Sequence, residues 1–336
     1  MTTPFNSRYG FAVGLIRVLE KRFFSKALLD RLLFSTSLGE AGRILSETGY
    51  GSEFADLKDV KQAEKLLEQK WDETLTLISK LTWESYWIDL FRKRIDYHNL
   101  KVLFKSKLTE KIDSDFLREG GFIPIDTLEK EVHSGKKESS FPFLDRAIKK
   151  VKAILSDSVA PYRIDLVLEK LEQEEWELVF EEHPNSFLQE WRSLEVDLFN
   201  LGLFLRIKYL NQDATFLDDG FIHGGTFERI FLLRLLEEPW ETVYKELRRT
   251  GYSEIISSSV RDLEDGWGFV SWERMCQEMK WHMLQPVKLY AFGVEVLFAY
   301  LFFKEIELSV VRKILVGNAN GLKGEIIKKG VPDVFF

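Results

Sequence analysis

Hydrophobic residues recur along most of this chain at the spacing of an amphipathic helix. Apolar side chains three and four positions apart share one face of a helix, which can then pack against a core. The alternation that is typical of strands between hairpin turns is scarce. The clearest stripes are Ala63, Leu67, Trp71, Leu75 and Ile78; Leu100, Phe104 and Leu108; Ile164, Leu168 and Leu171; and Trp272, Cys276, Met279 and Met283. This pattern predicts an all-α fold.

The most apolar stretch, residues 286–308, has the length of a membrane span. A span needs about 20 mostly apolar residues, but Lys288, Glu295 and Lys304 interrupt this one. An acidic residue near the middle of a span could carry an ion. We instead expect a buried core helix in which Glu295 finds a polar partner.

A second pattern is internal repetition, which in a long chain indicates copies of one structural unit. Leu45–Tyr50 and Leu247–Tyr252 share the pattern Leu-x-x-Thr-Gly-Tyr. Each copy follows a predicted helix, 38–45 or 240–247. We expect the glycine of each copy to adopt the left-handed conformation that closes a helix. A fainter counterpart, Val159–Tyr162, lies between them.

Two further elements follow in the same order after each copy. The first is an amphipathic segment that ends on tryptophan, at residues 63–71, 168–176 and 272–281. The second is an acidic residue with a partner three positions later, at Asp96 and Asn99, Asp197 and Asn200, and Glu307 and Val310. Chance can imitate one such element, but matching order and spacing are harder to imitate. The sequence therefore predicts three similar helical domains, at residues 1–110, 111–211 and 212–336.

The recurring polar pairs have a functional and a structural interpretation. Residues three apart on a helix share a face, so each pair could form a binding site. A site for chemistry is expected in one copy, whereas a buried hydrogen-bonded network that fixes helix packing is expected in all of them. We therefore interpret the repeat positions as structural: Tyr50, Asp96, Asn99, Asp197, Asn200, Tyr252, Glu307 and Arg312.

Motifs for catalysis and cofactor binding are absent from the sequence. There is no GxxxxGK[ST] phosphate loop, no GxGxxG before a helix and no HExxH. The histidines lack the spacing of metal ligands, and Cys276 is the single cysteine, so no disulfide or CxxC site can form within the chain. We predict a protein with no catalytic residue, no metal, no cofactor and no direct small-molecule substrate.

The net charge of −7 disfavours nucleic acid as a partner, because phosphate binding needs a basic surface. Residues 1–10 lack the basic and apolar regions of a signal peptide. We therefore expect a cytosolic chain.

Four segments resemble the C subunit of archaeal-type and bacterial V-type ATPases, the family of the eukaryotic vacuolar ATPase d subunit. They are Arg8–Phe24, Leu28–Leu29, Leu45–Tyr50 and the closing segment Gly293–Gly317. The closing segment carries the residues that mark the resemblance: Glu295, Tyr300, Lys304, Glu305, Glu307 and Arg312. The resemblance runs from about Arg8 to about Ile327. Val296 and Val310 depart from the family pattern, which often has Pro and Asn there.

This resemblance implies a funnel of three helical domains around a pseudo-three-fold axis. It implies a non-catalytic rotor subunit of the central stalk, peripheral on the cytoplasmic face of the membrane. Such a subunit joins the central shaft, formed by the D and F subunits, to the membrane rotor ring of proteolipid subunits. It transmits torque between ion transport and ATP synthesis or hydrolysis. The alternative is a helical-repeat scaffold unrelated to rotary ATPases.

Glycine-bearing loops follow the three acidic helices, and exposed loops of a three-fold body would face one end together. We predict that they bind the ring, with simple turns between helices as an equally supported alternative. Their residues are Gly121, Phe122, Ile123 and Pro124; Phe221, Ile222 and His223 after Gly220; and Gly321 and Leu322 after Asn320. Aspartate in place of Phe122 and Phe221 is predicted to release a folded chain from the ring.

Overall fold

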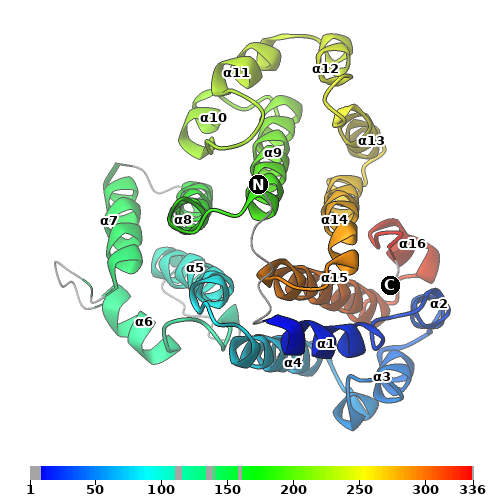
Figure 1. Ribbon diagram of the computed structural model, residues 1–336. Coiled ribbons are helices and arrows are strands. Elements are labelled where there is room, and N and C mark those ends of the chain that lie inside the picture. The colour runs from blue at the N-terminus through cyan, green and yellow to red at the C-terminus, as the bar shows by residue number, and fades with distance from the viewer. Residues whose placement is uncertain (1–8, 110–115, 134–138, 140, 158–160, 335–336) are drawn as a thin grey trace. The chain divides into compact units, whose positions relative to one another are not determined.

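The computed structural model describes residues 9–109, 116–133, 139, 141–157 and 161–334. In this part of the chain every regular element is a helix, which confirms the predicted all-α class (Figure 1). Two compact units divide the chain. Unit 1 is built from the described residues up to Trp83 and from Trp240 onward, and unit 2 from those between Glu84 and Pro239.

Unit 1 is organised around one buried helix, α15. This helix packs against α1, α3, α4, α14 and α16, and most of its residues are buried, on all sides. A helix that is apolar all round is typical of the centre of a large core. The helices of unit 1 are α1 (Gly10–Glu20), α2 (Lys26–Leu33), α3 (Leu38–Ser46), α4 (Val60–Leu81), α12 (Trp240–Leu247), α13 (Ser253–Glu264), α14 (Val270–Leu284), α15 (Val294–Ala319) and α16 (Gly324–Lys329), with short 3₁₀ helices at Ser52–Asp56 and Gln285–Leu289.

The apolar stretch 286–308 therefore forms the start of a core helix and the loop before it. Among the described residues, no helix has the length and hydropathy needed to cross a bilayer. The helix begins later than the pattern suggests, because Gly293 has φ +117°. This backbone conformation is not helical, so α15 begins at Val294. Glu295 consequently lies half-buried in the first turn, where the helix dipole favours an acidic side chain. The buried acidic residue of α15 is Glu307.

Unit 2 pairs two long antiparallel helices, α5 and α8. Ion pairs connect Lys93 to Glu175, Arg94 to Glu172, Lys101 to Glu169 and Lys105 to Asp165, with N–O distances of 2.8, 3.4, 2.9 and 2.6 Å. Behind them lies an apolar core that includes Leu100, Phe104, Leu144, Ile164 and Leu168. The helices of unit 2 are α5 (Tyr86–Thr109), α6 (Ile125–His133), α7 (Pro142–Asp157), α8 (Pro161–Glu182), α9 (Ser186–Tyr209), α10 (Thr215–Gly220) and α11 (Arg229–Glu237).

The repeated sequence elements have repeated structures. The tryptophan-ending segments lie on α4, α8 and α14; the first two of these helices both have 22 residues, whereas α14 has 15. The acidic positions lie on α5 and α9, each of 24 residues, and on α15, of 26 residues. Similar helices therefore recur in the same order along the chain.

The two Leu-x-x-Thr-Gly-Tyr copies share one set of hydrogen bonds. The hydroxyl of Thr48 donates to the Leu45 carbonyl at 2.5 Å, and that of Thr250 donates to the Leu247 carbonyl at 2.6 Å. The amide of the following tyrosine then donates to the same threonine oxygen in each copy.

The prediction of a left-handed glycine is confirmed for one copy and wrong for the other. Gly251 has φ +79°, but Gly49 is not left-handed. After α3 the chain continues through a turn, and the left-handed residue is Gly51, with φ +103°. In the fainter counterpart, Val159 and Ala160 lie outside the described residues.

Candidate partner-binding loops and the carboxylates that hold them

The first of the three repeated acidic residues holds the loop between α5 and α6. Asp96 is fully buried, and its carboxylate accepts hydrogen bonds from the amides of Phe122 and Ile123, each at 3.2 Å. One turn along α5, the side chain of Asn99 donates to the carbonyl of Arg118 and accepts from its amide, both at 2.8 Å. Asn99 therefore holds the loop at Arg118, and Asp96 holds it at Phe122 and Ile123.

The second acidic residue does the same for the loop between α10 and α11. Asp197 on α9 accepts a hydrogen bond of 2.6 Å from the Thr226 amide. Asn200 donates to the carbonyl of Ile222 at 2.7 Å and accepts from its amide at 3.0 Å. Both pairs are buried, and their side chains are hydrogen-bonded to backbone groups.

The third acidic residue, Glu307 on α15, reaches the beginning of the chain. One carboxylate oxygen accepts from the amide of Phe24, in the loop between α1 and α2, at 3.1 Å. The other accepts from the Tyr50 hydroxyl at 3.1 Å and from the ammonium of Lys304. We call Asp96, Asp197 and Glu307 the carboxylate anchors.

The loop held by the third anchor is thus Lys21–Ser25, which the sequence analysis did not single out. The predicted third loop, around Gly321 and Leu322, is the closing turn of α15 instead. Gly321 has φ +68°, and the amide of Leu322 donates to the Gly317 carbonyl at 2.9 Å. A signal did exist: Phe24 and Ile123 each end an apolar pair two residues before a helix begins.

Glycine is required where the anchor is an aspartate. A Cβ atom on Gly121 would overlap the carboxylate of Asp96, and one on Gly225 would overlap that of Asp197. Only a residue without a side chain lets the short aspartate reach the loop backbone. Glu307 is one methylene longer and reaches a loop, Lys21–Ser25, that has no glycine.

Burial raises the pKa of two groups at the anchors. Removal from water raises the pKa of Asp96 to about 7, against the opposing effect of the Ile123 and Phe122 amides and of Lys93 and Arg92. Burial, together with the neighbouring Glu307, raises the pKa of the Tyr50 hydroxyl above its ordinary value. Tyr50 therefore remains a hydrogen-bond donor to Glu307 at all physiological pH values.

The predicted partner-binding residues are divided between the surface and the interior. The exposed ones are Phe122 (39% exposed), Pro124, His223, Gly321 and Leu322, whereas Ile123, Phe221 (2% exposed) and Ile222 are buried and Gly121 is half-buried. The two phenylalanines differ because the first loop is held at Phe122 and Ile123 and the second at Ile222 and Thr226. Aspartate at position 221 would place a charge in the interior, so it cannot test partner binding in a folded chain.

Arg312, the last of the repeat positions, connects α15 to α4. Its guanidinium lies 2.7 Å from a carboxylate oxygen of Glu64, and both side chains are about one-third exposed. Tyr252 is buried like Tyr50.

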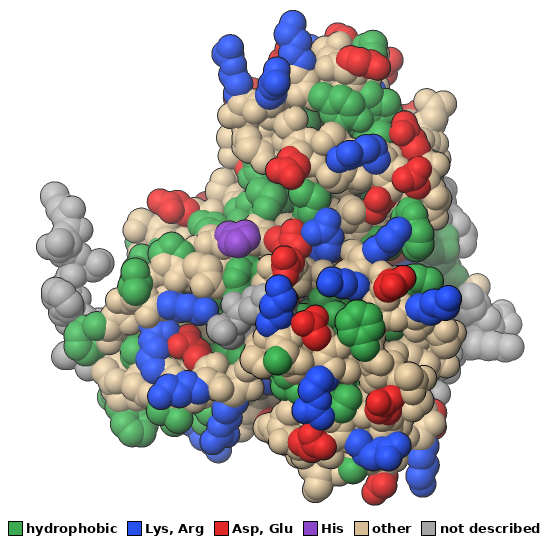
Figure 2. Space-filling model, turned by 90° about the vertical axis from the view of Figure 1, so that its right-hand side faces the viewer, with side chains coloured by type: hydrophobic (Ala, Val, Ile, Leu, Met, Phe, Trp, Pro, Cys, Tyr) green, Lys and Arg blue, Asp and Glu red, His purple; other side chains and the backbone are tan. Residues whose placement is uncertain are grey.

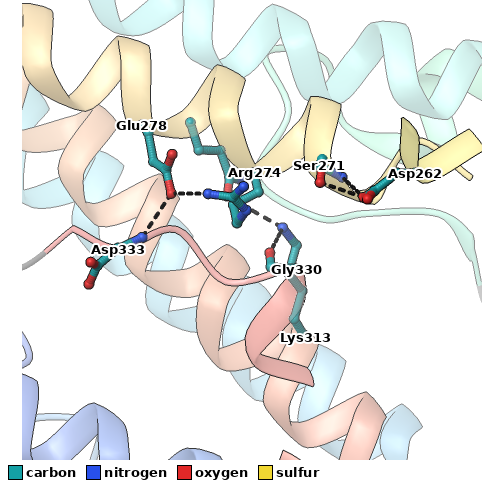
Figure 3. Close-up of polar contacts among 8 residues, drawn as sticks. Asp262, Ser271, Arg274, Glu278, Lys313, Gly330 and Asp333 are labelled. Carbon is teal, nitrogen blue, oxygen red and sulfur yellow. Dashed lines mark hydrogen bonds and ion pairs between the residues drawn. The ribbon is translucent and has the colours of Figure 1, made fainter. Parts of the chain in front are cut away.

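A cavity of about 510 Å³ in unit 1 lies among α2, α13, α14, α16 and Val331–Asp333. Figure 3 shows polar contacts beside this cavity: Glu278 accepts from Arg274 at 2.7 Å and from the Asp333 amide at 3.0 Å, and Lys313 donates to the Gly330 carbonyl at 2.7 Å. Ser271 donates to Asp262 beside them. These contacts fasten residues 330–333 onto α14 and α15.

The surface around this cavity gives no sign of a specific ligand. The face that carries α2 and α16 has basic and acidic side chains interspersed, without a large patch of one sign (Figure 2). Within the part of the chain that the structure describes, no three His, Cys, Asp or Glu side chains are placed to hold a metal ion.

Comparison with known proteins extends over nearly the whole chain. A family model described as ATP synthase (C/AC39) subunit matches residues 12–330. The C subunit of the V-type sodium ATPase of Enterococcus hirae is 24% identical, over 96% of this chain and 97% of its own length. The C subunit of the A-type ATP synthase of Pyrococcus furiosus is also 24% identical, over 97% of this chain and 90% of its own. The matched region contains all three carboxylate anchors.

Proposed function

This chain belongs to the ATP synthase (C/AC39) subunit family, whose members are non-catalytic subunits of V/A-type rotary ATPases, and we propose that it is the central-stalk subunit that joins the shaft to the membrane rotor ring. Its partners are the D and F subunits of the shaft and the proteolipid subunits of the ring. It lies on the cytoplasmic face of the membrane and transmits torque between ion transport and ATP synthesis or hydrolysis. Family membership argues against an unrelated helical scaffold.

The observation that carries this proposal is the order in which the carboxylate anchors connect the predicted domains. Asp96, in residues 1–110, holds a loop of the second domain. Asp197, in residues 111–211, holds a loop of the third. Glu307, in residues 212–336, holds a loop of the first. With these boundaries, each anchor joins one predicted domain to the next, and the third anchor joins the last predicted domain to the first.

This cyclic order supports a closed body of three domains, 1–110, 111–211 and 212–336, arranged as a funnel around one axis. An axis is what a rotor subunit needs, because the shaft and the ring must turn together with it. The anchors also favour stiffness. They are buried and bind backbone amides, so the domains cannot slide past one another without breaking buried hydrogen bonds.

The load on such a body exceeds what surface ion pairs can carry. A few charges that cross a membrane potential store on the order of 10 kcal/mol, while an exposed ion pair contributes about 0–1 kcal/mol. Contacts to shaft and ring are therefore broad and contain aromatic anchors. We propose that the exposed side chains of the predicted loops supply part of the ring contact, with Phe122, Pro124, His223 and Leu322 as the members that solvent can reach.

Co-purification with the shaft subunits and the membrane ring tests the proposal. Phe122→Asp is expected to abolish recovery of the ring and to leave the D and F subunits bound. Leu178→Asp is the matched control, because Leu178 is a similarly exposed apolar residue of unit 2 on α8. Failure of the folded wild-type chain to recover either partner would remove the stalk assignment. Equal loss of the ring in both variants would remove Phe122 from the contact.

A further inference from the structure

Helix α1 and the loop before α15 expose a group of large apolar side chains in unit 1. The most exposed are Leu289 (89%) and Phe11 (79%), joined by Val18, Tyr290 and Phe292. Phe11 and Val18 are seven residues apart and so share one face of α1. The ring of Phe292 lies directly beside Gly10, which places the loop along the same helix. We call these five residues the α1 surface.

Arg17 holds the backbone on both sides of Leu289 and so keeps the Leu289 side chain exposed. One guanidinium nitrogen of Arg17 donates to the Val287 carbonyl at 2.8 Å and to the Tyr290 carbonyl at 3.0 Å. Its other terminal nitrogen is held by Glu20 at 2.8 Å. The two carbonyls flank Leu289, so its backbone is fixed while its side chain points away from the core. A folded protein seldom exposes such a group of large apolar side chains without a partner.

The charges around the α1 surface are predominantly positive, although the chain as a whole has a net charge of −7. Exposed Lys21 and Arg22 follow directly at the end of α1, and half-buried Lys288 lies in the loop. Arg17 is neutralised by Glu20, and Glu295 begins the next helix. The local balance is therefore about two positive charges beside an apolar face.

We propose that the α1 surface rests on the anionic lipid surface of the membrane. Aromatic and aliphatic side chains enter the boundary between headgroups and acyl chains, while nearby Lys and Arg attract anionic lipids. Tyr290 suits this boundary because its ring is apolar and its hydroxyl stays wet. This inference rests on the proposed function, which brings the chain to a membrane, and it adds a lipid contact to the protein contacts of the stalk.

The test is flotation of the purified full chain with protein-free vesicles. One set contains phosphatidylcholine alone, and the other contains phosphatidylcholine with phosphatidylglycerol. The wild-type chain is expected to float with the anionic set and to be released by salt. Leu289→Asp is expected to weaken binding about tenfold or more, because one fully inserted leucine is lost. Lys21→Gln and Arg22→Gln are each expected to weaken it about fivefold.

Ile230→Asp is the matched control, because Ile230 is 70% exposed on α11 and is no part of the α1 surface. It is expected to bind vesicles like the wild type. Absence of wild-type binding to anionic vesicles, or equal losses in L289D and I230D, would overturn the proposal. So would L289D that keeps vesicle binding and loses the ring, since the surface would then contact protein. Loss of the shaft and ring in co-purification, with vesicle binding intact, would instead count against the proposed function alone.

Discussion

The long helices α15 and α5 occupy the same position in their repeats but are stabilised in different ways. α15 is buried on all sides in unit 1, and its packing against α4 depends on apolar residues such as Leu67, Leu75 and Ile78. α5 is partly exposed, and the ion pairs from Lys93 to Lys105 connect it to α8. A central helix has little exposed surface on which to keep charges, whereas an outer helix pair can use charges along its length to fix its register.

The difference extends to the anchors of the two helices. Asp96 on α5 needs only two backbone amides and a glycine in the loop. Glu307 on α15 is also buried, beside the Tyr50 ring, and takes two further donors, Tyr50 and Lys304. The Lys304 ammonium lies 4.6 Å from the centre of the Tyr50 ring, which adds a cation–π contact. Such partners offset the removal of the Glu307 carboxylate from water.

Removal of the Glu307 carboxylate is the change expected to have the largest effect. Glu307→Ala leaves the Lys304 ammonium and the Phe24 amide buried without an acceptor, and we expect unit 1 to lose about 3–5 kcal/mol of stability. Urea unfolding followed by circular dichroism measures this loss. Glu307→Gln keeps an acceptor oxygen and should lose clearly less. Equal losses in the two variants would show that shape, not hydrogen bonding, holds the α1–α2 loop.

Gly121→Ala tests the requirement for glycine beside the shorter anchor, in unit 2. The new Cβ would overlap the Asp96 carboxylate, so the loop must move away, at an expected cost of about 2–3 kcal/mol from disrupted buried hydrogen bonds. Unfolding of the single variant and of the double variant with Asp96→Ala gives the coupling between the two sites. The cost of Gly121→Ala should largely vanish in the Asp96→Ala background.

Gly14→Ala is the control for this substitution, because a Cβ at Gly14 meets no atom within 4 Å. Alanine in a helix should leave unit 1 unchanged or more stable by about 1 kcal/mol. A similar loss at both glycines would mean that the effect at Gly121 does not come from the anchor.

The helices and their order could be predicted from the sequence because they depend on local patterns. The stripe Leu100, Phe104 and Leu108 does lie on the core side of α5, with Leu108 partly buried. The Leu-x-x-Thr-Gly-Tyr copies do share their hydrogen bonds. Such features are set by residues a few positions apart, where periodicity and turn chemistry are informative.

The loops could be predicted only in part because their partners are distant in sequence. Phe24 and Glu307 are 283 positions apart, and no local pattern connects them. Phe122 and Phe221 stand in the same Gly-Phe-Ile context, yet one is exposed and the other buried. Which side chain of a loop points outward depends on the amide that the anchor binds, and this is decided by tertiary packing.

The stability of unit 2 is expected to depend on pH through Asp96. The pKa of Asp96 is about 7 in the folded chain and about 3.9 in an unfolded one. The folded state therefore holds the proton more tightly, so the stabilisation is complete below pH 4 and is lost as the pH rises through 7. Between pH 5 and pH 8 we expect unit 2 to lose about 2.5 kcal/mol. Urea unfolding at several pH values measures this, and Asp96→Asn, which cannot ionise, should remove most of the slope.

The ion pairs between α5 and α8 are expected to give the smallest effect. Lys101 and Glu169 are 2.9 Å apart, but their side chains are 21% and 39% exposed. Water and salt screen such a pair, so a double-mutant cycle with Lys101→Ala and Glu169→Ala should give a coupling of about 0.2–1 kcal/mol that shrinks as salt is added. The same cycle on Arg312 and Glu64, at the seam of α15 and α4, should give a similar value, because those side chains are also about one-third exposed. A coupling above about 2 kcal/mol at Lys101 would mean that this seam depends on its charges for strength and not only for register. The two helices would then be held about equally strongly, α15 by apolar packing and α5 by ion pairs.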